Sequence, residues 1–135
     1  MNELLILRGI PASGKSTFAK KFIEKNKYWL IISRDSIRDM FGHYWLPERE
    51  NLVKECEFSM IKLCLNNKWN VVVDDTNLNS KTFQELQDLA NECNARVIVK
   101  DFEISLEEAL ERNRNREKVL PDEVIKGFYE RYKNV

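Results

Sequence analysis

Short apolar runs alternate with longer segments of helical periodicity along this chain. The apolar runs cover residues 4–7, 29–33, 69–74 and 96–102. The segments in which apolar residues recur every three or four positions cover residues 18–23, 48–66 and 82–93. The run at residues 4–7 suits a strand buried on both faces, and the other three are short runs with β-branched residues, which favour strands. Their alternation with helices predicts an α/β domain built on a doubly wound parallel sheet with helices on both faces.

The helical periodicity also predicts part of the core. The expected buried stripes are Leu52, Val53, Cys56, Met60, Leu63 and Cys64 in the first long segment, and Phe83, Leu86, Leu89 and Ala90 in the second. Ser105 and Glu108 have the spacing of a capping box at a helix start, and Pro121 suits the first turn of the last helix. No repeat or linker interrupts the pattern, so we expect one domain over residues 1–135.

Composition restricts the setting of this domain more than its chemistry. With 43% hydrophobic and 33% charged residues the chain resembles a soluble globular domain, and no apolar run approaches the roughly 18 residues that span a membrane. The first strand follows the N-terminus almost at once, so we expect no signal peptide. Three cysteines without C-x-x-C spacing indicate core residues rather than a disulfide or a zinc site, which favours a cytoplasmic location.

The segment from Gly9 to Thr17 carries the strongest chemical signal. It matches G-x-x-x-x-G-K-[ST] and lies between a predicted strand and a predicted helix. In this phosphate-loop arrangement, successive backbone N–H groups and the helix N-terminus converge on phosphate oxygens. We therefore expect ATP or another nucleoside triphosphate as the phosphate donor, bound with Mg²⁺, because a glycine turn without a ligand explains the full motif poorly. The expected nucleotide-binding residues are Gly9, Ser13, Gly14, Lys15, Ser16 and Thr17.

Two of these side chains have specific expected roles. Lys15 should reach the β- and γ-phosphates, and Ser16 should offer its hydroxyl to the Mg²⁺ that bridges them. The loop also makes the expected fold a phosphate-loop NTPase type of α/β domain, with ligands at the carboxyl ends of the strands.

Polar residues at the end of the second predicted strand could serve the acceptor of a phosphoryl group. Asp35 follows that strand directly, and Arg38 lies three residues beyond it. A carboxylate in this place can take the proton from an attacking hydroxyl. The alternative, equally supported by the pattern alone, is that Asp35 or Ser33 only caps the helix that follows.

The third predicted strand ends in two aspartates, Asp74 and Asp75. Many phosphate-loop enzymes supply a carboxylate near Mg²⁺ from this position, so one of the two is expected to face the metal site. A polar turn after a buried strand remains the alternative.

A basic segment near the C-terminus is the remaining candidate. The chain carries 22 Lys and Arg against 22 Asp and Glu, so it has no overall basic field. Arg112 and Arg116 are one helical turn apart and could point together at a phosphate chain, whereas Arg114 projects away. We favour a lid that closes over nucleotide, with a solvated charged surface as the alternative.

These pieces, in this order, resemble the 5′-kinase domain of phage-type polynucleotide 5′-hydroxyl kinases. The resemblance is carried by the phosphate loop, Arg34-Asp35, Arg38, Asp75-Thr76-Asn77-Leu78-Asn79, Arg112-Asn113, Arg116, Pro121, Asp122 and Val124. It implies that Asp35 is the general base for the 5′-hydroxyl and that Arg38 holds the acceptor's phosphate. It further implies that Asp75 supports the metal and phosphate site and that Arg116 clamps the donor phosphates.

The chain also departs from that family. The segment between Arg116 and Pro121 looks one residue shorter than in the phage enzyme, and no phosphatase domain is fused to the kinase. A phosphatase or ligase activity would therefore belong to a separate partner. The aromatic residues within 41–46 could stack a terminal base, or Trp45 could anchor an exposed loop in the core. His43 is expected at the surface without a catalytic role.

The sequence thus predicts an enzyme that moves the γ-phosphoryl group of ATP to the 5′-hydroxyl end of DNA or RNA. A kinase for a sugar, antibiotic or nucleoside could share this scaffold, but Arg38 suits an acceptor that already carries a phosphate. A nucleotide-dependent binding module would have no need of a base such as Asp35. Neither the preferred nucleic acid nor the oligomeric state follows from the residues.

Overall fold

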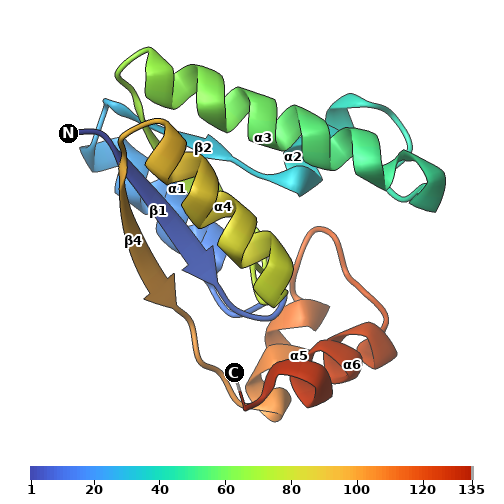
Figure 1. The fold of residues 1–135 in the computed structure, drawn as a ribbon. Helices are drawn as coiled ribbons and strands as arrows, with labels where there is room; N and C mark the ends of the chain where they lie inside the picture. Colours follow the sequence, from blue (N-terminus) through green and yellow to red (C-terminus); the bar gives the residue numbers. More distant parts are fainter. Residues whose placement is uncertain (135) are drawn as a thin grey trace.

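A computed structural model describes residues 1–134 as four strands, six α-helices and one 3₁₀ helix (Figure 1). In chain order these are β1 (Glu3–Arg8), α1 (Lys15–Lys25), β2 (Trp29–Ile32), α2 (Arg34–Met40), the 3₁₀ helix η1 (Pro47–Arg49), α3 (Glu50–Asn66), β3 (Asn70–Asp74), α4 (Ser80–Glu92), β4 (Arg96–Asp101), α5 (Leu106–Arg114) and α6 (Asp122–Tyr132). The predicted strands are confirmed to within one residue at each end.

The strands form one parallel sheet in the order β2-β3-β1-β4. The pairing aligns Leu5 of β1 with Val72 of β3 and with Ile98 of β4. Because β1 and β3 are the inner strands, their residues are buried on both faces, which explains their uninterrupted apolar sequences. The sheet confirms the predicted α/β class and brings the carboxyl ends of all four strands to one edge.

Helices cover both faces of the sheet (Figure 1). Helices α3 and α4 pack on one face, where Leu4, Ile61 and Leu86 belong to the larger core cluster. Helix α1 packs on the other face, with Ala19 and Val72 in a second cluster. Both layers place the start of their helices near the carboxyl edge of the sheet, where a phosphate loop is expected to act.

The predicted buried stripe of α3 was partly wrong. Leu52, Met60 and Leu63 are 50%, 39% and 65% exposed. Val53 is buried as predicted, and the other buried positions are Glu57, Ile61 and Leu65, which continue the row of Val53 along the helix. The apolar pattern alone could not distinguish between two adjacent rows of residues along α3. The row that is buried contains Glu57, and a charged residue is normally expected at the surface.

The last two helices form a small body at the carboxyl edge of the sheet (Figure 1). Ala109 of α5 and Ile125 of α6 are fully buried and share a cluster with Ile10 of the loop after β1. Ser105 accepts a hydrogen bond from the backbone N–H of Glu108, which confirms the predicted cap of α5. This packing fixes the predicted lid against the phosphate loop.

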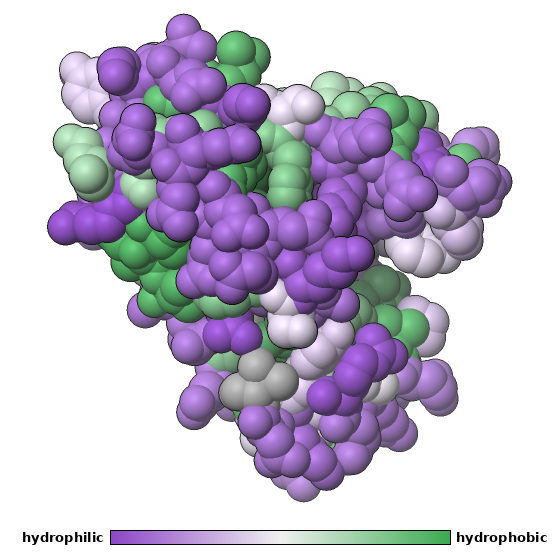
Figure 2. Space-filling view, viewed as in Figure 1, coloured by the Kyte–Doolittle hydropathy of each residue, from purple (hydrophilic) through white to green (hydrophobic). Residues whose placement is uncertain are grey.

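Figure 2 shows that the visible face is mostly polar and is hollowed between the start of α3 and the two C-terminal helices. Within residues 1–134, no helix is long and apolar enough to cross a membrane.

Candidate active site

The phosphate loop between β1 and α1 has the backbone shape that its glycines allow. Gly14 has a φ of 102° and Ala12 one of 71°, so the chain turns through the left-handed region twice. At Gly9, a Cβ atom would lie 2.6 Å from Oγ of Ser13, so a side chain does not fit there. The Gly9 N–H also donates to the carbonyl of Thr76 at 3.0 Å, which ties the loop to the end of β3.

Lys15 lies folded into this loop and is only 7% exposed. Its Nζ donates to the carbonyls of Gly9 and Ile10, each at 2.8 Å. Burial lowers the pKa of Lys15 from 10.5 to about 8, against the opposing charge of Asp74, and Arg116 lowers it further. An anion bound in the loop would stabilise the charged ammonium form of Lys15, which is the form that binds phosphate.

Ser16 and Asp74 meet where the loop faces the end of β3. The Ser16 hydroxyl donates to Oδ2 of Asp74 at 2.7 Å. Burial raises the pKa of Asp74, while the hydrogen bond from Ser16 and the charge of Lys15 oppose that rise. Two oxygens are therefore placed side by side at the position expected for the metal.

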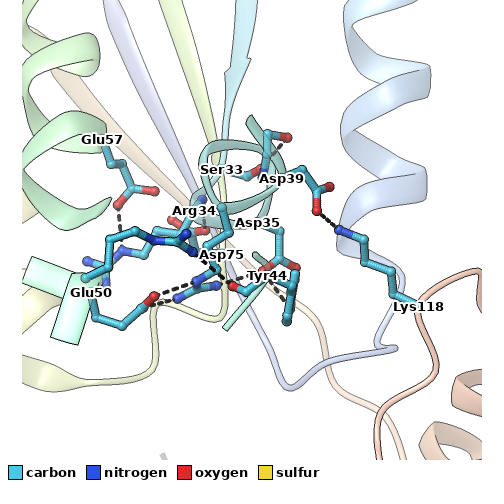
Figure 3. Close-up of polar contacts among 12 residues, drawn as sticks. Ser33, Arg34, Asp35, Asp39, Tyr44, Glu50, Glu57, Asp75 and Lys118 are labelled. Atoms are coloured by element: carbon cyan, nitrogen blue, oxygen red, sulfur yellow. Dashed lines mark hydrogen bonds and ion pairs between the residues drawn. The ribbon is translucent and has the colours of Figure 1, made fainter. Parts of the chain in front are cut away.

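Asp75 points to a different place. Its Oδ1 accepts a hydrogen bond from the backbone N–H of Arg34 at 2.8 Å, at the start of α2 (Figure 3). Burial, with the Glu57 carboxyl close by, raises the pKa of Asp75 well above its usual value. The structure thus brings Asp74, rather than Asp75, against Ser16, because successive residues leave a strand on opposite faces.

Glu57 completes this second network and was not found from the sequence. It is fully buried on α3 and accepts a hydrogen bond from Nε of Arg34 at 3.0 Å. Among residues 1–134, Oε2 of Glu57, Oδ2 of Asp75 and Nη2 of Arg34 are buried without a hydrogen-bond partner. The charged residue inside an otherwise apolar row was the only sequence signal for it.

Asp35 lies in the first turn of α2 without capping it. The cap is Ser33, whose side chain accepts from the backbone N–H of Ser36 at 3.1 Å. Oδ1 of Asp35 instead accepts from Nη1 of Arg38 at 2.7 Å and from the Tyr44 hydroxyl at 2.8 Å (Figure 3). Burial beside that carboxylate raises the pKa of Tyr44 to about 12, which keeps the hydroxyl a donor. The cap role expected for either Asp35 or Ser33 therefore falls to Ser33.

Arg38 connects the carboxylates on this side of the site. Besides Asp35, it pairs with Glu50 at the start of α3, with 3.0 Å between Nε and Oε2. Its guanidinium carbon lies 5.5 Å from the centre of the Trp45 ring and 5.9 Å from that of Tyr44. Arg38 is thus held in place on the same helix face as Asp35.

The predicted lid segment leaves α5 earlier than expected. The helix ends at Arg114, so Arg112 lies on it, whereas Arg116 follows in the turn. The two arginines therefore do not share one helical face. They nevertheless approach the same loop: Nη1 of Arg112 lies 3.5 Å from the Ser13 carbonyl, and Arg116 is close enough to Lys15 to lower its pKa.

Arg116 and Arg114 have different surroundings. Within residues 1–134, Nη1 of Arg116 is buried without a hydrogen-bond partner. Arg114 instead pairs with Asp122 at 3.4 Å at the start of α6. A buried guanidinium nitrogen beside the phosphate loop fits an anionic ligand there.

Two further lid residues escaped sequence reasoning. The side chain of Asn113 is fully buried and bonds both the N–H and the carbonyl of Leu120, at 3.1 and 2.7 Å, which pins the connection between α5 and α6. Lys118 forms an ion pair with Asp39 of α2 and lies 4.6 Å from the centre of the Tyr44 ring (Figure 3). The segment therefore reaches from the phosphate loop to α2.

The residues present fit a nucleoside triphosphate with Mg²⁺. A side chain would not fit at Gly9, and within the described part of the chain Nη1 of Arg116 is buried without a hydrogen-bond partner, near enough to Lys15 to lower its pKa. Ser16 and Asp74 offer two oxygens, which suits an ion that is otherwise held by phosphate oxygens and water. Ser16 is exposed and so open to such a ligand.

The chain is similar to several known proteins along nearly its whole length. The AAA domain family matches residues 4–135. An L-seryl-tRNA(Sec) kinase of Methanococcus maripaludis is 37% identical over 133 residues, which are 96% of this chain and 52% of that protein. A putative bifunctional polynucleotide kinase/RNA ligase of Autographa californica nuclear polyhedrosis virus is 35% identical over 150 residues, which are 98% of this chain and 21% of that protein.

Among solved structures, one chain of the Pnkp1/Rnl/Hen1 RNA repair complex superposes with a TM-score of 0.87 at 30% identity, over 98% of this chain and 44% of that one. This chain therefore spans about half or less of the length of the relatives it matches.

Proposed function

We propose that this chain, a phosphate-loop kinase of the AAA domain family that is similar to a polynucleotide kinase/RNA ligase, phosphorylates the 5′-hydroxyl end of DNA or RNA with ATP. One observation carries the proposal. Asp35 forms a hydrogen-bonded pair with Arg38 and lies close enough to Lys15 to influence its pKa. One edge of the sheet thus holds three groups: Asp35 as the general base, Arg38 as the cation for an acceptor phosphate, and Lys15 for the donor phosphates.

On the donor side, the loop N–H groups and Lys15 hold the β- and γ-phosphates. Ser16 and Asp74 would hold Mg²⁺, which neutralises charge on those phosphates when bound. We therefore assign the metal role to Asp74 and a positioning role to Asp75, which fixes the start of α2 through the Arg34 N–H. Arg116 is placed to contact the transferring group.

On the acceptor side, the oxygen of the 5′-hydroxyl forms a bond to the γ-phosphorus, and Asp35 takes the proton of that hydroxyl. The bond from that phosphorus to the bridging oxygen breaks, and ADP leaves. Arg38 binds the phosphate on the 3′ side of the same nucleotide, for which its bidentate geometry is suited. Glu50 holds the guanidinium in place until that phosphate arrives.

A second candidate is phosphorylation of a hydroxyl on an aminoacylated tRNA. The 37% identity to the L-seryl-tRNA(Sec) kinase favours it. Both reactions transfer phosphate to an alcohol carried by a nucleic acid, so the site chemistry is shared. They differ in which hydroxyl reaches Asp35.

The test offers labelled ATP to the purified chain with a panel of acceptors. These are a 5′-hydroxyl oligonucleotide, the same oligonucleotide already 5′-phosphorylated, a nucleoside 3′-monophosphate, a plain nucleoside and seryl-tRNA. We expect label on the first and third only. Label on seryl-tRNA alone would establish the second candidate, and label on the plain nucleoside as good as on its 3′-monophosphate would contradict the role of Arg38.

The Arg38→Ala variant tests the same proposal internally. It should raise the apparent KM for the 3′-monophosphate and leave the slow hydrolysis of ATP in water near its normal rate, because the guanidinium serves the acceptor. The matched control is Arg131→Ala on α6, whose guanidinium lies over Phe128 and Tyr132. An equal loss of hydrolysis in Arg38→Ala would place that arginine on the donor.

A further inference from the structure

The segment between α2 and η1 carries aromatic side chains that the proposed chemistry does not use. Trp45 is 58% exposed, and Tyr44 is half-buried. Trp45 belongs to none of the core clusters found in residues 1–134, so it does not anchor this segment in the core as one sequence-based alternative held. Single exposed apolar residues are common on protein surfaces, so exposure alone gives no reason to assign Trp45 a function.

The position of Trp45 supplies that reason. One face of its ring receives the guanidinium of Arg38, at 5.5 Å from the ring centre. Arg38 contacts Asp35, and the Tyr44 hydroxyl contacts the same carboxylate at 2.8 Å. The exposed Trp45 ring is therefore separated from Asp35, the proposed general base, by one side chain, that of Arg38.

A terminal nucleotide has three recognisable parts on one sugar: the 5′-hydroxyl, the 3′-phosphate and the base. With the 5′-hydroxyl at Asp35 and the 3′-phosphate at Arg38, the nucleobase would project from that sugar beside helix α2. An aromatic ring that is flanked by a cation on one face and open on the other is a stacking platform for a base.

We propose that Trp45 stacks the base of the acceptor's 5′-terminal nucleotide, with Arg38 supporting the opposite face of the ring. The inference rests on the proposed function and deepens it, because it makes the enzyme select ends that carry a base. Stacking is tolerant of base identity, since every base presents a π-face.

A second exposed aromatic pair shows that exposure alone does not carry the argument. Tyr28 and Trp69 are 62% and 38% exposed, with ring centres 6.1 Å apart. They precede β2 and β3 and so lie at the amino edge of the sheet, away from Lys15 and Asp35. Trp69→Ala is therefore a matched control for the loss of an exposed tryptophan.

The experiment measures steady-state kinetics with two oligonucleotides that differ only in the 5′-terminal nucleotide, one normal and one abasic. Both keep the 5′-hydroxyl and all phosphates. We expect the wild-type chain to show a KM about five- to a hundredfold lower for the acceptor with the base. That ratio should fall to within about twofold in Trp45→Ala and be partly restored in Trp45→Phe, since phenylalanine keeps an aromatic face. Trp69→Ala should keep the full ratio.

Fluorescence gives a second readout that does not depend on turnover. Binding of the normal oligonucleotide should quench tryptophan emission in the wild type and in Trp69→Ala but not in Trp45→Phe. If Trp45→Ala raised KM equally for both acceptors, the ring would only position Arg38 and the platform would be overturned. If the wild-type KM were the same for the normal and the abasic acceptor, the stacking proposal would be overturned and the proposed function would stand. If neither oligonucleotide received phosphate, both the stacking proposal and the proposed function would be overturned.

Discussion

The donor and acceptor sides of the site are built from the sequence in different ways. The core of the donor side is one contiguous loop, in which Lys15 bonds to carbonyls five and six residues before it, although Asp74 reaches Ser16 from β3. The acceptor side combines a local pair, Asp35 with Arg38, with a buried network of distant residues, in which Arg34 bonds to Asp75 across 41 positions and to Glu57 across 23. Local geometry therefore defines the phosphate loop, and tertiary packing fixes the start of α2, which carries Asp35.

This difference predicts whether substitutions on each side reduce activity alone or also reduce the stability of the fold. A donor residue can be removed with loss of chemistry and little loss of fold, because its neighbours in the chain hold the loop. An acceptor residue that belongs to the buried network affects the fold as well, since unpaired buried charges are costly. The predictions that follow separate these two behaviours.

The largest effect is expected for Lys15→Ala, with transfer reduced by about a thousandfold or more, because the ammonium neutralises charge on the phosphates. Thermal unfolding should change little, since burial already lowers the pKa of Lys15 to about 8 and so makes its charge costly in the nucleotide-free chain. Single-turnover rates at saturating ATP, together with circular dichroism, check both parts. Lys20→Ala, an exposed lysine on the same helix, is the control. Near-normal turnover in the folded Lys15 variant would break the donor assignment.

On the acceptor side, Asp35→Asn should lower kcat by about a hundredfold or more while ATP binding stays near wild type, because a general base is lost. Asparagine can still accept from Arg38 and Tyr44, so the geometry is kept. Ser33→Ala is the matched variant: it removes the cap of α2 and should cost about 1 kcal/mol of unfolding free energy without a comparable loss of rate. Calorimetry and rapid-quench rates distinguish the two, and equal rate losses would contradict the separation.

The same contrast explains what the sequence could predict. The sheet, its helices and the phosphate loop followed from patterns within a few residues of one another. The cap of α5 at Ser105 was predicted for the same reason. Each of these depends on local geometry that a short motif records.

The remaining features depend on packing between distant elements. Periodicity could not show that Glu57 is buried, because its partner Arg34 lies on another helix. Likewise, Asp74 and Asp75 are adjacent, and only the pleat of β3 and the position of α2 decide which one meets Ser16. The path of the lid past Arg114 was also hidden, because it depends on the buried Asn113 side chain, which bonds to the backbone of Leu120 seven residues later.

Glu57→Ala tests whether the acceptor side depends on buried charge. It should lower the unfolding free energy by about 3 kcal/mol or more, because Arg34 loses the partner of a buried ion pair. Glu85→Ala is the control, since its pair with Lys54 is about one-third exposed on both sides and is worth at most about 1 kcal/mol. Urea unfolding of both variants gives the difference. Similar values for the two would show that the network does not hold the acceptor side.

The smallest effect is expected in the lid, where Arg116→Ala should reduce kcat by about tenfold or more and Arg114→Ala by less than about twofold. Arg116 lies near enough to Lys15 to lower its pKa and has a buried Nη1, whereas Arg114 pairs with Asp122. Both substitutions remove one positive charge from the same short segment, so net charge is matched. Rates at saturating ATP and acceptor are the measurement.

Salt dependence decides what a difference between the two arginines means. A general attraction for nucleic acid would weaken both variants alike and would fade as salt screens exposed charges. A contact to the transferring phosphate, made by the buried Nη1 of Arg116, would single out Arg116 and persist at high salt. Equal and salt-sensitive losses would therefore remove the lid from the donor side and leave the phosphate loop alone to bind the donor.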